Sequence, residues 1–219
     1  MDYHLEILGR CPLFAGVDPG DIPGMLGCLG ARAEKKEKGS VILSAGEPVR
    51  WVGIVLSGAV DILRQEYDGS RRLLAHLTPG QLFAESFACA GVESCPVDVT
   101  AGTDAEILRL DVHRVTHSCG SACAFHTRLI YNLLHIVSEK NLLFHRRLEI
   151  TSKRTTRERL LTYLEMCSRE QGSRRFTIPF DRQDLADYLG VDRSGLSAEI
   201  SRLRGEGVLE NRKREFVLL

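Results

Sequence analysis

The chain has 219 residues, of which 43% are hydrophobic and 26% are charged, as in an ordinary globular protein with room for one or two domains. Lysine plus arginine and aspartate plus glutamate each number 29, so the formal net charge is zero. This balance excludes a histone-like polycation and a protein held on membranes mainly by charge, and any nucleic-acid surface must be local.

The N-terminal residues show no basic segment followed by an apolar one, so we expect no secretory signal. The longest apolar stretch, Trp51 to Val60, is interrupted by glycines and falls short of the roughly 20 residues that span a bilayer. The seven cysteines form no CxxC pair, which is typical of reduced thiols. We therefore expect a cytoplasmic protein without membrane contact.

Between about Lys38 and Leu110, short β-branched and leucine-rich runs alternate with glycine and proline, a spacing that predicts a barrel or jelly roll. The segment Tyr67 to Ser70 contains Asp-Gly and is typical of a hairpin tip. The predicted strands are Val41–Leu43, Trp51–Leu56, Ala59–Arg64, Arg71–Leu77, Val97–Ala101 and Glu106–Leu110.

The segment from about Ser121 to Ile150 contains neither glycine nor proline and predicts one long helix. Thirty helical residues extend about 45 Å, longer than a small roll is wide, so we expect part of the helix to pack on a partner chain in a homodimer. The alternative is a helix packed only along its own domain. The predicted apolar stripe is Ile130, Leu133, Val137, Phe144 and Leu148, and Leu129, Leu134, Ile136, Leu142 and Leu143 also need cover.

Residues 152–219 contain 14 basic and 11 acidic side chains, whereas residues 1–151 contain 15 basic and 18 acidic ones. This asymmetry favours the C-terminal end as a nucleic-acid face, although a solvated helix face could carry the same excess.

Residues 181–203 predict two short helices joined by a tight turn. Asp181 and Asp192 are placed as N-caps, and Gly190 lies where the turn needs a left-handed residue. Ala186 is small where the two helices would cross. The predicted buried face consists of Leu185, Leu189, Leu196, Ile200 and Leu203. The pattern indicates a helix-turn-helix, and the alternative is a helical hairpin used only for packing.

The second of these helices would present its first turns to a DNA groove. Arg193 is the candidate for a bidentate contact to guanine, and Ser194 and Ser197 for base edges or phosphate. Residues 207–219 predict a hairpin with a basic tip, the wing of a winged helix. The candidates for phosphate contacts are Lys153, Arg182, Gln183 and Arg202.

In this order of elements the chain resembles the cAMP receptor protein/FNR family of bacterial transcription regulators. The motifs that carry the resemblance are Gly39 to Pro48, Val55 to Gly58, Pro79 to Glu85 and the helix-turn-helix. It covers nearly the whole chain. One departure is Ala198, where many relatives carry arginine, so their half-site sequence does not transfer.

The resemblance implies an α+β fold with an N-terminal double-stranded β-roll, similar to a cyclic-nucleotide-binding domain, over residues 1–118. A dimerisation helix over 119–151 and a C-terminal winged helix-turn-helix over 152–219 would follow. It also implies a homodimer that binds a palindromic promoter site, contacts RNA polymerase and is switched by an effector in the roll.

The family's contacts with a cyclic nucleotide can be compared with this sequence residue by residue. In the family, a glutamate binds the ribose hydroxyl and an Arg-Ser pair binds the cyclic phosphate. Glu85 matches the glutamate, but Cys95 and Pro96 occupy the other two positions and offer neither a cation nor a hydroxyl. The residues that would face the purine, Leu142 and Leu143, offer no hydrogen bond. We therefore expect no response to cAMP.

The default expectation is an unidentified small organic effector, anionic if Arg64, Arg71 or Arg72 turns inward. An iron–sulfur cluster is not expected, because Cys11 and Cys28 are too few and too far apart. Haem is not expected either, because His76 is the sole histidine between Lys38 and Leu110.

Two further constellations suggest a sensor. Cys89 and Cys95 flank a five-residue loop and could form a disulfide that reports oxidation, or they are unrelated thiols. The pairs His113/His117 and Cys119/Cys123 have the four-residue step of metal ligands on one helix face, with His126 nearby. The break at Gly120-Ser121 could equally point these two pairs apart.

An alternative hypothesis from a different functional class is a cupin-like metalloenzyme, because a β-roll is related to the barrel of the cupins. Such enzymes need a His-x-His pair, a glutamate and a further histidine, and this roll supplies one histidine. No catalytic fingerprint is present in the sequence, so we expect no enzyme.

Overall fold

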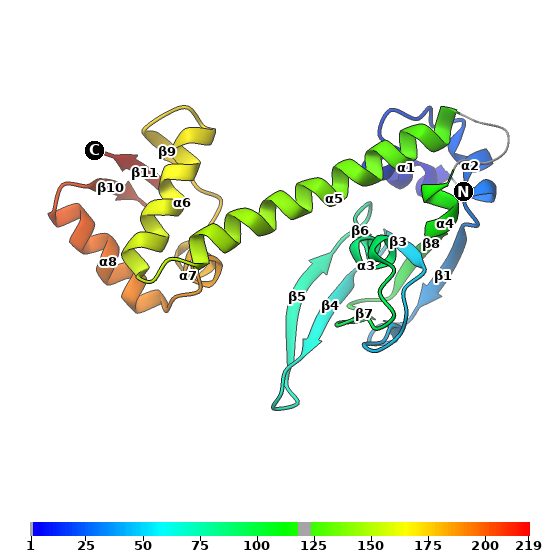
Figure 1. Ribbon diagram of the computed structural model, residues 1–219, viewed down its shortest axis with the longest axis horizontal. Helices are drawn as coiled ribbons and strands as arrows, with labels where there is room; N and C mark the ends of the chain where they lie inside the picture. Colours follow the sequence, from blue (N-terminus) through cyan, green and yellow to red (C-terminus); the bar gives the residue numbers. More distant parts are fainter. Residues whose placement is uncertain (1, 118–123) are drawn as a thin grey trace. The chain divides into compact units, whose positions relative to one another are not determined.

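The computed structural model describes residues 2–117 and 124–219. The chain divides into two compact units, residues 1–138 and 139–219, each with its own hydrophobic core. Helix α5 (Ala124–Thr151) begins in the first unit and ends in the second (Figure 1).

The first unit is a β-roll of two antiparallel four-stranded sheets, with strand orders β1-β8-β3-β6 and β2-β7-β4-β5. The six predicted strands are confirmed to within one residue at each end. The sequence did not predict β1, which is almost wholly polar, or β6, which has two residues. The strands are β1 Arg32–Lys36, β2 Val41–Leu43, β3 Trp51–Ser57, β4 Val60–Gln65, β5 Arg71–Leu77, β6 Leu82–Phe83, β7 Asp98–Ala101 and β8 Ala105–Asp111.

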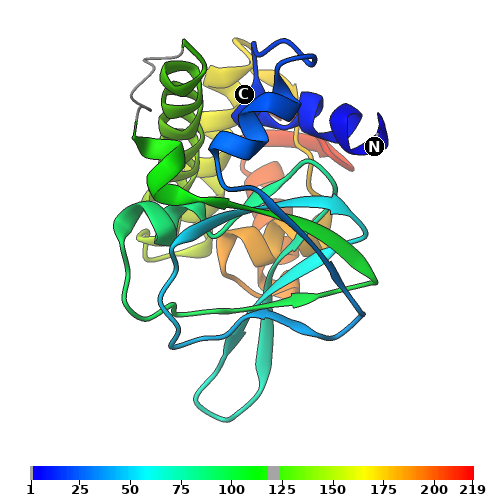
Figure 2. The same ribbon diagram turned by 90° about the vertical axis from the view of Figure 1, so that its right-hand side faces the viewer.

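The β4–β5 hairpin projects from the roll (Figure 2). Its predicted tip is confirmed, because Gly69 has φ +82° and the Glu66 amide donates to the Ser70 carbonyl at 2.8 Å. Glycine is needed there because a side chain resists positive φ.

The core of the roll forms around β3, whose residues from Val52 to Leu56 are buried. Gly53 lies under the Phe83 ring, where an added Cβ would come within 2.2 Å of a ring carbon. Asn132 on α5 donates to the Leu13 and Ala15 carbonyls, both at 2.9 Å, and so fixes α5 to the N-terminal segment. The remaining helices of this unit are α1 Asp2–Arg10, η1 Pro12–Phe14, α2 Ile22–Cys28, α3 Glu85–Ala90 and α4 Val112–Thr116.

The predicted long helix is confirmed over Ala124–Thr151, but its apolar residues divide differently from the expected stripe. Leu129, Leu133 and Ile136 are buried within the chain, whereas Phe144 and Leu148 are exposed. Positions three and four apart form one helix face, and two such faces lie side by side here. Leu129, Leu133, Ile136 and, in part, Val137 pack on the core of the roll.

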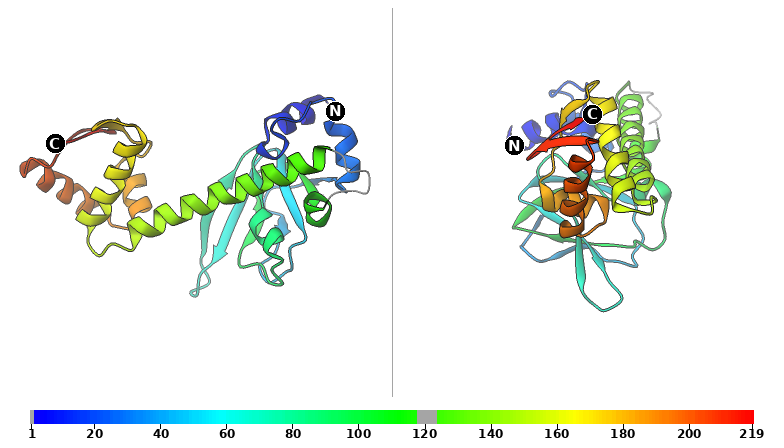
Figure 3. Two further views of the ribbon diagram at one scale, coloured as in Figure 1. Left: turned by 45° about the horizontal axis from the view of Figure 1, so that its top comes forward. Right: turned by 90° about the vertical axis from the view of Figure 1, so that its left-hand side faces the viewer.

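The second unit is a helix-turn-helix followed by a β-hairpin, which confirms the predicted winged helix (Figure 3). The end of α5 belongs to this unit, because Ile150 is fully buried in its core and Arg146 lies 2.7 Å from Glu170. The elements are α6 Thr156–Glu170, β9 Arg175–Thr177, α7 Arg182–Leu189, α8 Arg193–Gly205, β10 Leu209–Arg212 and β11 Glu215–Leu218.

Within the described ranges, no helix combines the length and apolar character that crossing a bilayer requires.

Candidate nucleic-acid interface

The first helix of the motif, α7, begins at the predicted N-cap. The Asp181 carboxylate accepts from the amides of Gln183 at 2.8 Å and Asp184 at 2.9 Å, and Asp184 bonds back to the Asp181 amide. This reciprocal pair satisfies amides that a helix start leaves open. The helix ends at Gly190, whose φ of +65° confirms the predicted left-handed turn.

The second helix, α8, begins at Asp192. Its carboxylate accepts from the Gly195 amide at 2.8 Å and from the Ser194 hydroxyl at 2.6 Å, and the Ser194 bond in particular lowers the pKa of Asp192. The Ser197 hydroxyl donates to the Arg193 carbonyl at 2.9 Å. Both hydroxyl protons are therefore used within the helix, so a DNA donor group would find only their lone pairs free.

Both helices pack by the predicted face, and Ala186 is fully buried. Leu185, Leu189, Leu196, Ile200 and Leu203 are at most 3% exposed. Because this face is used for the core, Arg193, Ser194 and Ala198 are left exposed.

The starts of both helices and the tip of the wing meet around Asp181. The amides of Asp184 and Gln183, together with the charges of Arg214 and Arg193, lower the pKa of Asp181. The Arg214 carbonyl accepts from the Ile178 amide at 2.9 Å, which holds the β10–β11 turn beside this corner. The wing-tip side chains were not among the predicted contacts, although the Arg212-Lys213-Arg214 run is a visible signal.

Arg182 is half-buried at the start of α7. Burial lowers the pKa of this guanidinium, and the charge of Arg193 adds to the effect. Its Nη1 is buried and has no hydrogen-bond partner among the residues that the structure describes. This nitrogen is closed to solvent in this conformation, so the contact of Arg182 with a DNA phosphate stays a prediction.

The other predicted phosphate contacts have partners within the chain. Gln183 donates to Asp187 at 3.0 Å, and Arg202 donates to Glu199 at 3.1 Å. Lys153 lies between α5 and α6 and is partly exposed. Their contacts with DNA stay predictions.

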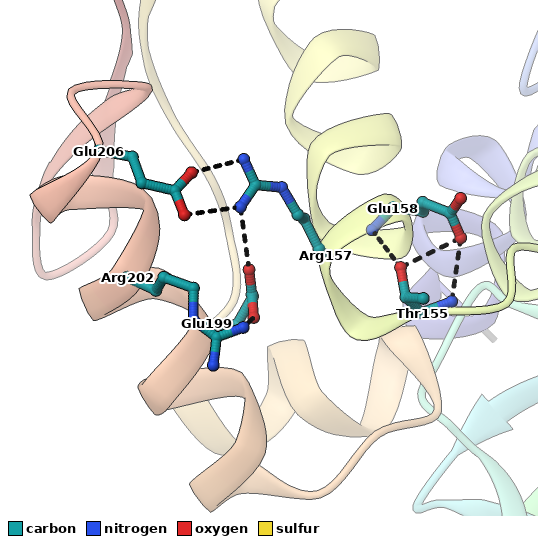
Figure 4. A network of polar contacts seen from close by, with 6 residues as sticks. All are labelled: Thr155, Arg157, Glu158, Glu199, Arg202 and Glu206. Atoms are coloured by element: carbon teal, nitrogen blue, oxygen red, sulfur yellow. Dashed lines mark hydrogen bonds and ion pairs between the residues drawn. The ribbon is translucent and has the colours of Figure 1, made fainter.

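An ion network joins α6 to the end of α8 (Figure 4). Arg157 donates to both carboxylate oxygens of Glu206, at 3.0 and 2.6 Å, and lies 3.7 Å from Glu199, which is only 8% exposed. The sequence did not predict this network, because Arg157 is more than 40 residues away from both glutamates.

The predicted effector residues are distributed over both units. Glu85 is buried at the start of α3, where the preceding Ala84 has φ +64°. Cys95 is 1% exposed, and its backbone is hydrogen-bonded to Gly46 and Glu47. In contrast, Arg72 lies exposed on β5. Leu142 and Leu143 are each 59% exposed and belong to the unit of residues 139–219.

A pocket of about 410 Å³ between α3 and α4 brings together Arg50, Cys89, His113 and His117. The two imidazole rings are stacked, with centroids 3.8 Å apart and planes 9° apart. Parallel rings direct their in-plane lone pairs alongside one another, so in this conformation they do not converge on one ion.

The remaining members of the predicted metal set are not part of this pocket. Cys119 and Cys123 lie outside the described residues, and His126 is buried. Across residues 2–117 and 124–219, no three His, Cys, Asp or Glu side chains form a group able to hold a metal ion. The metal set stays a prediction.

The predicted redox pair consists of two free thiols. Cys89 is exposed and Cys95 is buried. Burial raises the pKa of both, with further contributions from Glu85 at Cys89 and from Asp98 at Cys95. A raised pKa lowers the thiolate fraction, so the structure gives neither thiol an activating environment.

Two family models match the chain. The cyclic nucleotide-binding domain family matches residues 33–119, and the Crp-like helix-turn-helix domain family matches residues 158–219. The transcriptional activator protein FnrL of Cereibacter sphaeroides is 22% identical over 192 residues, which cover 84% of this chain and 74% of that protein. The nitrogen fixation regulation protein FixK of Rhizobium meliloti is 25% identical over 158 residues, covering 71% and 67%.

Among solved structures, the c-di-GMP-responsive global regulator CLP of Xanthomonas campestris has a similar fold. The TM-score is 0.53 at 20% identity, and the match covers 92% of this chain and 99% of that one.

Proposed function

The chain belongs to the Crp/FNR family and is a DNA-binding transcription regulator of that type, and on this premise we propose that it acts as a cytoplasmic homodimer on palindromic promoter DNA. We assign effector binding to residues 1–118, dimerisation to 119–151 and DNA binding to 152–219. The protein regulates rather than catalyses, and it contacts RNA polymerase at the promoter.

The observation that carries the DNA-reading assignment is the start of α8. Arg193 is exposed in the first turn, directly after the Asp192 cap. A guanidinium there suits the two acceptors that guanine presents in the major groove. We assign phosphate contacts to Arg182, whose charge acts on Arg193, and to the wing-tip residue Arg214. Two copies would read half-sites about 34–36 Å apart.

The effector is a small molecule other than cAMP. The family's cyclic-phosphate pair is replaced by Cys95 and Pro96, and the Cys95 side chain is in the core rather than at a binding surface. Neither residue supplies a positive charge for a phosphate. Effector binding would shift the population between two arrangements of the dimer with different spacing of the recognition helices.

Two experiments test the proposal. Footprinting on genomic fragments selected by the protein is expected to show a two-fold symmetric site, whereas an unsymmetric footprint would contradict the palindrome. Calorimetric titration with cAMP is expected to show no binding, and a micromolar or tighter Kd would contradict the effector assignment.

A further inference from the structure

The turn between α7 and α8, residues 190–192, is held by a side chain of α6. The Val191 amide donates to the Ala186 carbonyl at 3.0 Å and closes the turn. The carbonyls of Leu189 and Gly190 come too late in the helix to be used by its own hydrogen-bond ladder. Both accept from Nη1 of Arg159, at 3.2 and 2.9 Å.

The same guanidinium also binds the linker between α5 and α6, residues 152–155. Its Nε donates to the Lys153 carbonyl at 2.9 Å. The Lys153 amide in turn donates to the Ile150 carbonyl at 3.2 Å, and Ile150 is fully buried in the core of this unit. Arg159 therefore joins the linker to the turn that precedes α8.

An arginine is suited to this place because its donors are held in a planar fork. Nε and Nη1 belong to one rigid group and donate to two separate backbone segments, so these segments keep a fixed separation. A lysine ammonium also has three donors, but they share one nitrogen at the end of a flexible chain. It cannot occupy both donor positions at once.

Each of the two segments carries a predicted contact to DNA. Lys153 lies in the linker and is a candidate for a phosphate, and Arg193 follows Gly190 by three residues and is the candidate for guanine. Phosphate contacts fix the register of a protein on the duplex, and base contacts read the sequence. The two contacts support each other only when the distance between them is fixed.

We propose that Arg159 is a positioning residue for DNA reading, which holds Lys153 and the start of α8 at one fixed separation. Arg159 is partly buried, and its Nε and Nη1 are used by carbonyls of the chain, so it acts through geometry rather than by touching DNA. This inference rests on the DNA contacts of the proposed function, but the link itself can be tested without DNA.

Hydrogen exchange on the full-length protein tests the link. The Lys153 and Val191 amides are both hydrogen-bonded, so their exchange reports the opening of each segment. In the wild type, at increasing urea below the unfolding transition, we expect both to open with the same free energy and the same urea dependence. Different urea dependences would contradict the link. This measurement needs no variant, so it holds even if a substitution prevents folding.

The variant Arg159→Lys should speed exchange in both segments at least about fivefold, the effect of roughly one lost hydrogen bond, and leave residues 160–167 of α6 unchanged. The matched control is Arg169→Lys on the same helix, whose guanidinium lies 3.8 Å from Glu165 of that helix. It should alter neither segment. Faster exchange in one segment alone, or equally throughout residues 156–219, would overturn the inference.

DNA binding tests the consequence. On a duplex that carries the selected site and on a random duplex of the same length, Arg159→Lys should lower the ratio of the two affinities at least about fivefold, the effect of one mismatched base pair. Lys153→Ala should weaken binding to the selected site at least about threefold less in the Arg159→Lys protein than in the wild type. Fluorescence anisotropy measures these affinities.

The outcomes separate this inference from the DNA contacts on which it rests. If Lys153→Ala and Arg193→Ala each weaken binding but the effects of Lys153→Ala and Arg159→Lys simply add, the positioning role is overturned and the contacts stand. If neither alanine variant weakens binding to the selected site, the contacts and the positioning role both fail.

Discussion

The guanidinium of Arg157 and the carboxylate of Glu206 form two parallel hydrogen bonds, at 3.0 and 2.6 Å, between the first turn of α6 and the residue that follows α8. Arg157 also faces Glu199, whose Oε1 is buried and accepts no hydrogen bond among the described residues. The same arginine therefore ties the C-terminal end of α8 to α6 and offsets a buried charge.

Replacing Arg157 should destabilise the packing of the C-terminal end of α8 against α6. We expect Arg157→Gln to lower the Tm and the affinity for specific DNA, because Glu199 is left as a less compensated buried carboxylate. Glu206→Gln should have a smaller effect, since Arg157 still faces Glu199. The control is Arg169→Gln, whose exposed guanidinium lies 3.8 Å from Glu165. Calorimetry and fluorescence anisotropy measure both quantities, and equal effects of all three variants would refute this role.

Arg193 and Lys153 should affect DNA binding differently. Arg193→Ala is expected to cost about 1–3 kcal/mol on the specific site and to relax discrimination at one base pair. Lys153→Ala should weaken specific and random DNA alike and reduce the salt dependence of binding by about one counterion. Titrations at several salt concentrations separate the two effects. Equal losses for both variants on both DNAs would refute the assignment.

Acid should destabilise the DNA-binding unit through its helix caps and its ion network. Hydrogen bonds lower the pKa values of Asp181, Asp192, Glu158 and Glu206 below their ordinary values of 3.8 and 4.5. The ionised forms are favoured in the folded state, so their stabilisation is complete above about pH 5 and is lost as the pH falls through the lowered pKa values. Thermal unfolding between pH 6 and 3 measures this, and Asp192→Asn should flatten the decline. If the stability of Asp192→Asn fell with pH as steeply as that of the wild type, the Asp192 cap would contribute nothing to the pH dependence.

Replacing Ala84 by glycine should increase the stability of the folded protein. Its φ of +64° is left-handed, a region that costs a non-glycine residue about 1–2 kcal/mol. Ala84→Gly relieves this strain but adds unfolded-state entropy, so we expect a net gain of up to about 1 kcal/mol. The matched control, Ala88→Gly within α3, should be destabilising by about 1 kcal/mol. Urea denaturation compares them, and destabilisation by both variants would contradict the strain.

Alkylation should follow burial among the described thiols. Cys28 and Cys89 are exposed, whereas Cys11, Cys95 and Cys167 are buried, and burial raises the pKa of Cys11 to about 11. At pH 8 we expect iodoacetamide to modify Cys28 and Cys89 well before these three, as read by peptide mass spectrometry. Rapid labelling of Cys95 would support the hypothesis that Cys89 and Cys95 form a redox-sensitive pair. A difference in DNA binding between diamide-treated and reduced protein would support it as well.

Local chemistry in the sequence was sufficient for much of the DNA-binding unit. Asp181, Asp192 and Gly190 were assignable because N-caps and left-handed turns depend on residues within a few positions of each other. The buried leucines followed from helical periodicity for the same reason. Strands β1 and β6 escaped prediction, because one has no apolar alternation and the other is two residues long.

Tertiary structure decided what depends on distant residues. Only the fold joined Arg157 to Glu206, brought Arg214 near Asp181, and buried Cys95. It also divided the apolar residues of α5, burying Leu129, Leu133 and Ile136 in the core of the roll and leaving Leu134, Phe144 and Leu148 exposed. The sequence alone determined that α5 is a long apolar helix, since periodicity is a property of neighbours along the chain. Which of its two adjoining faces would be covered depended on what the rest of the chain packs against it, and that is a property of the folded structure.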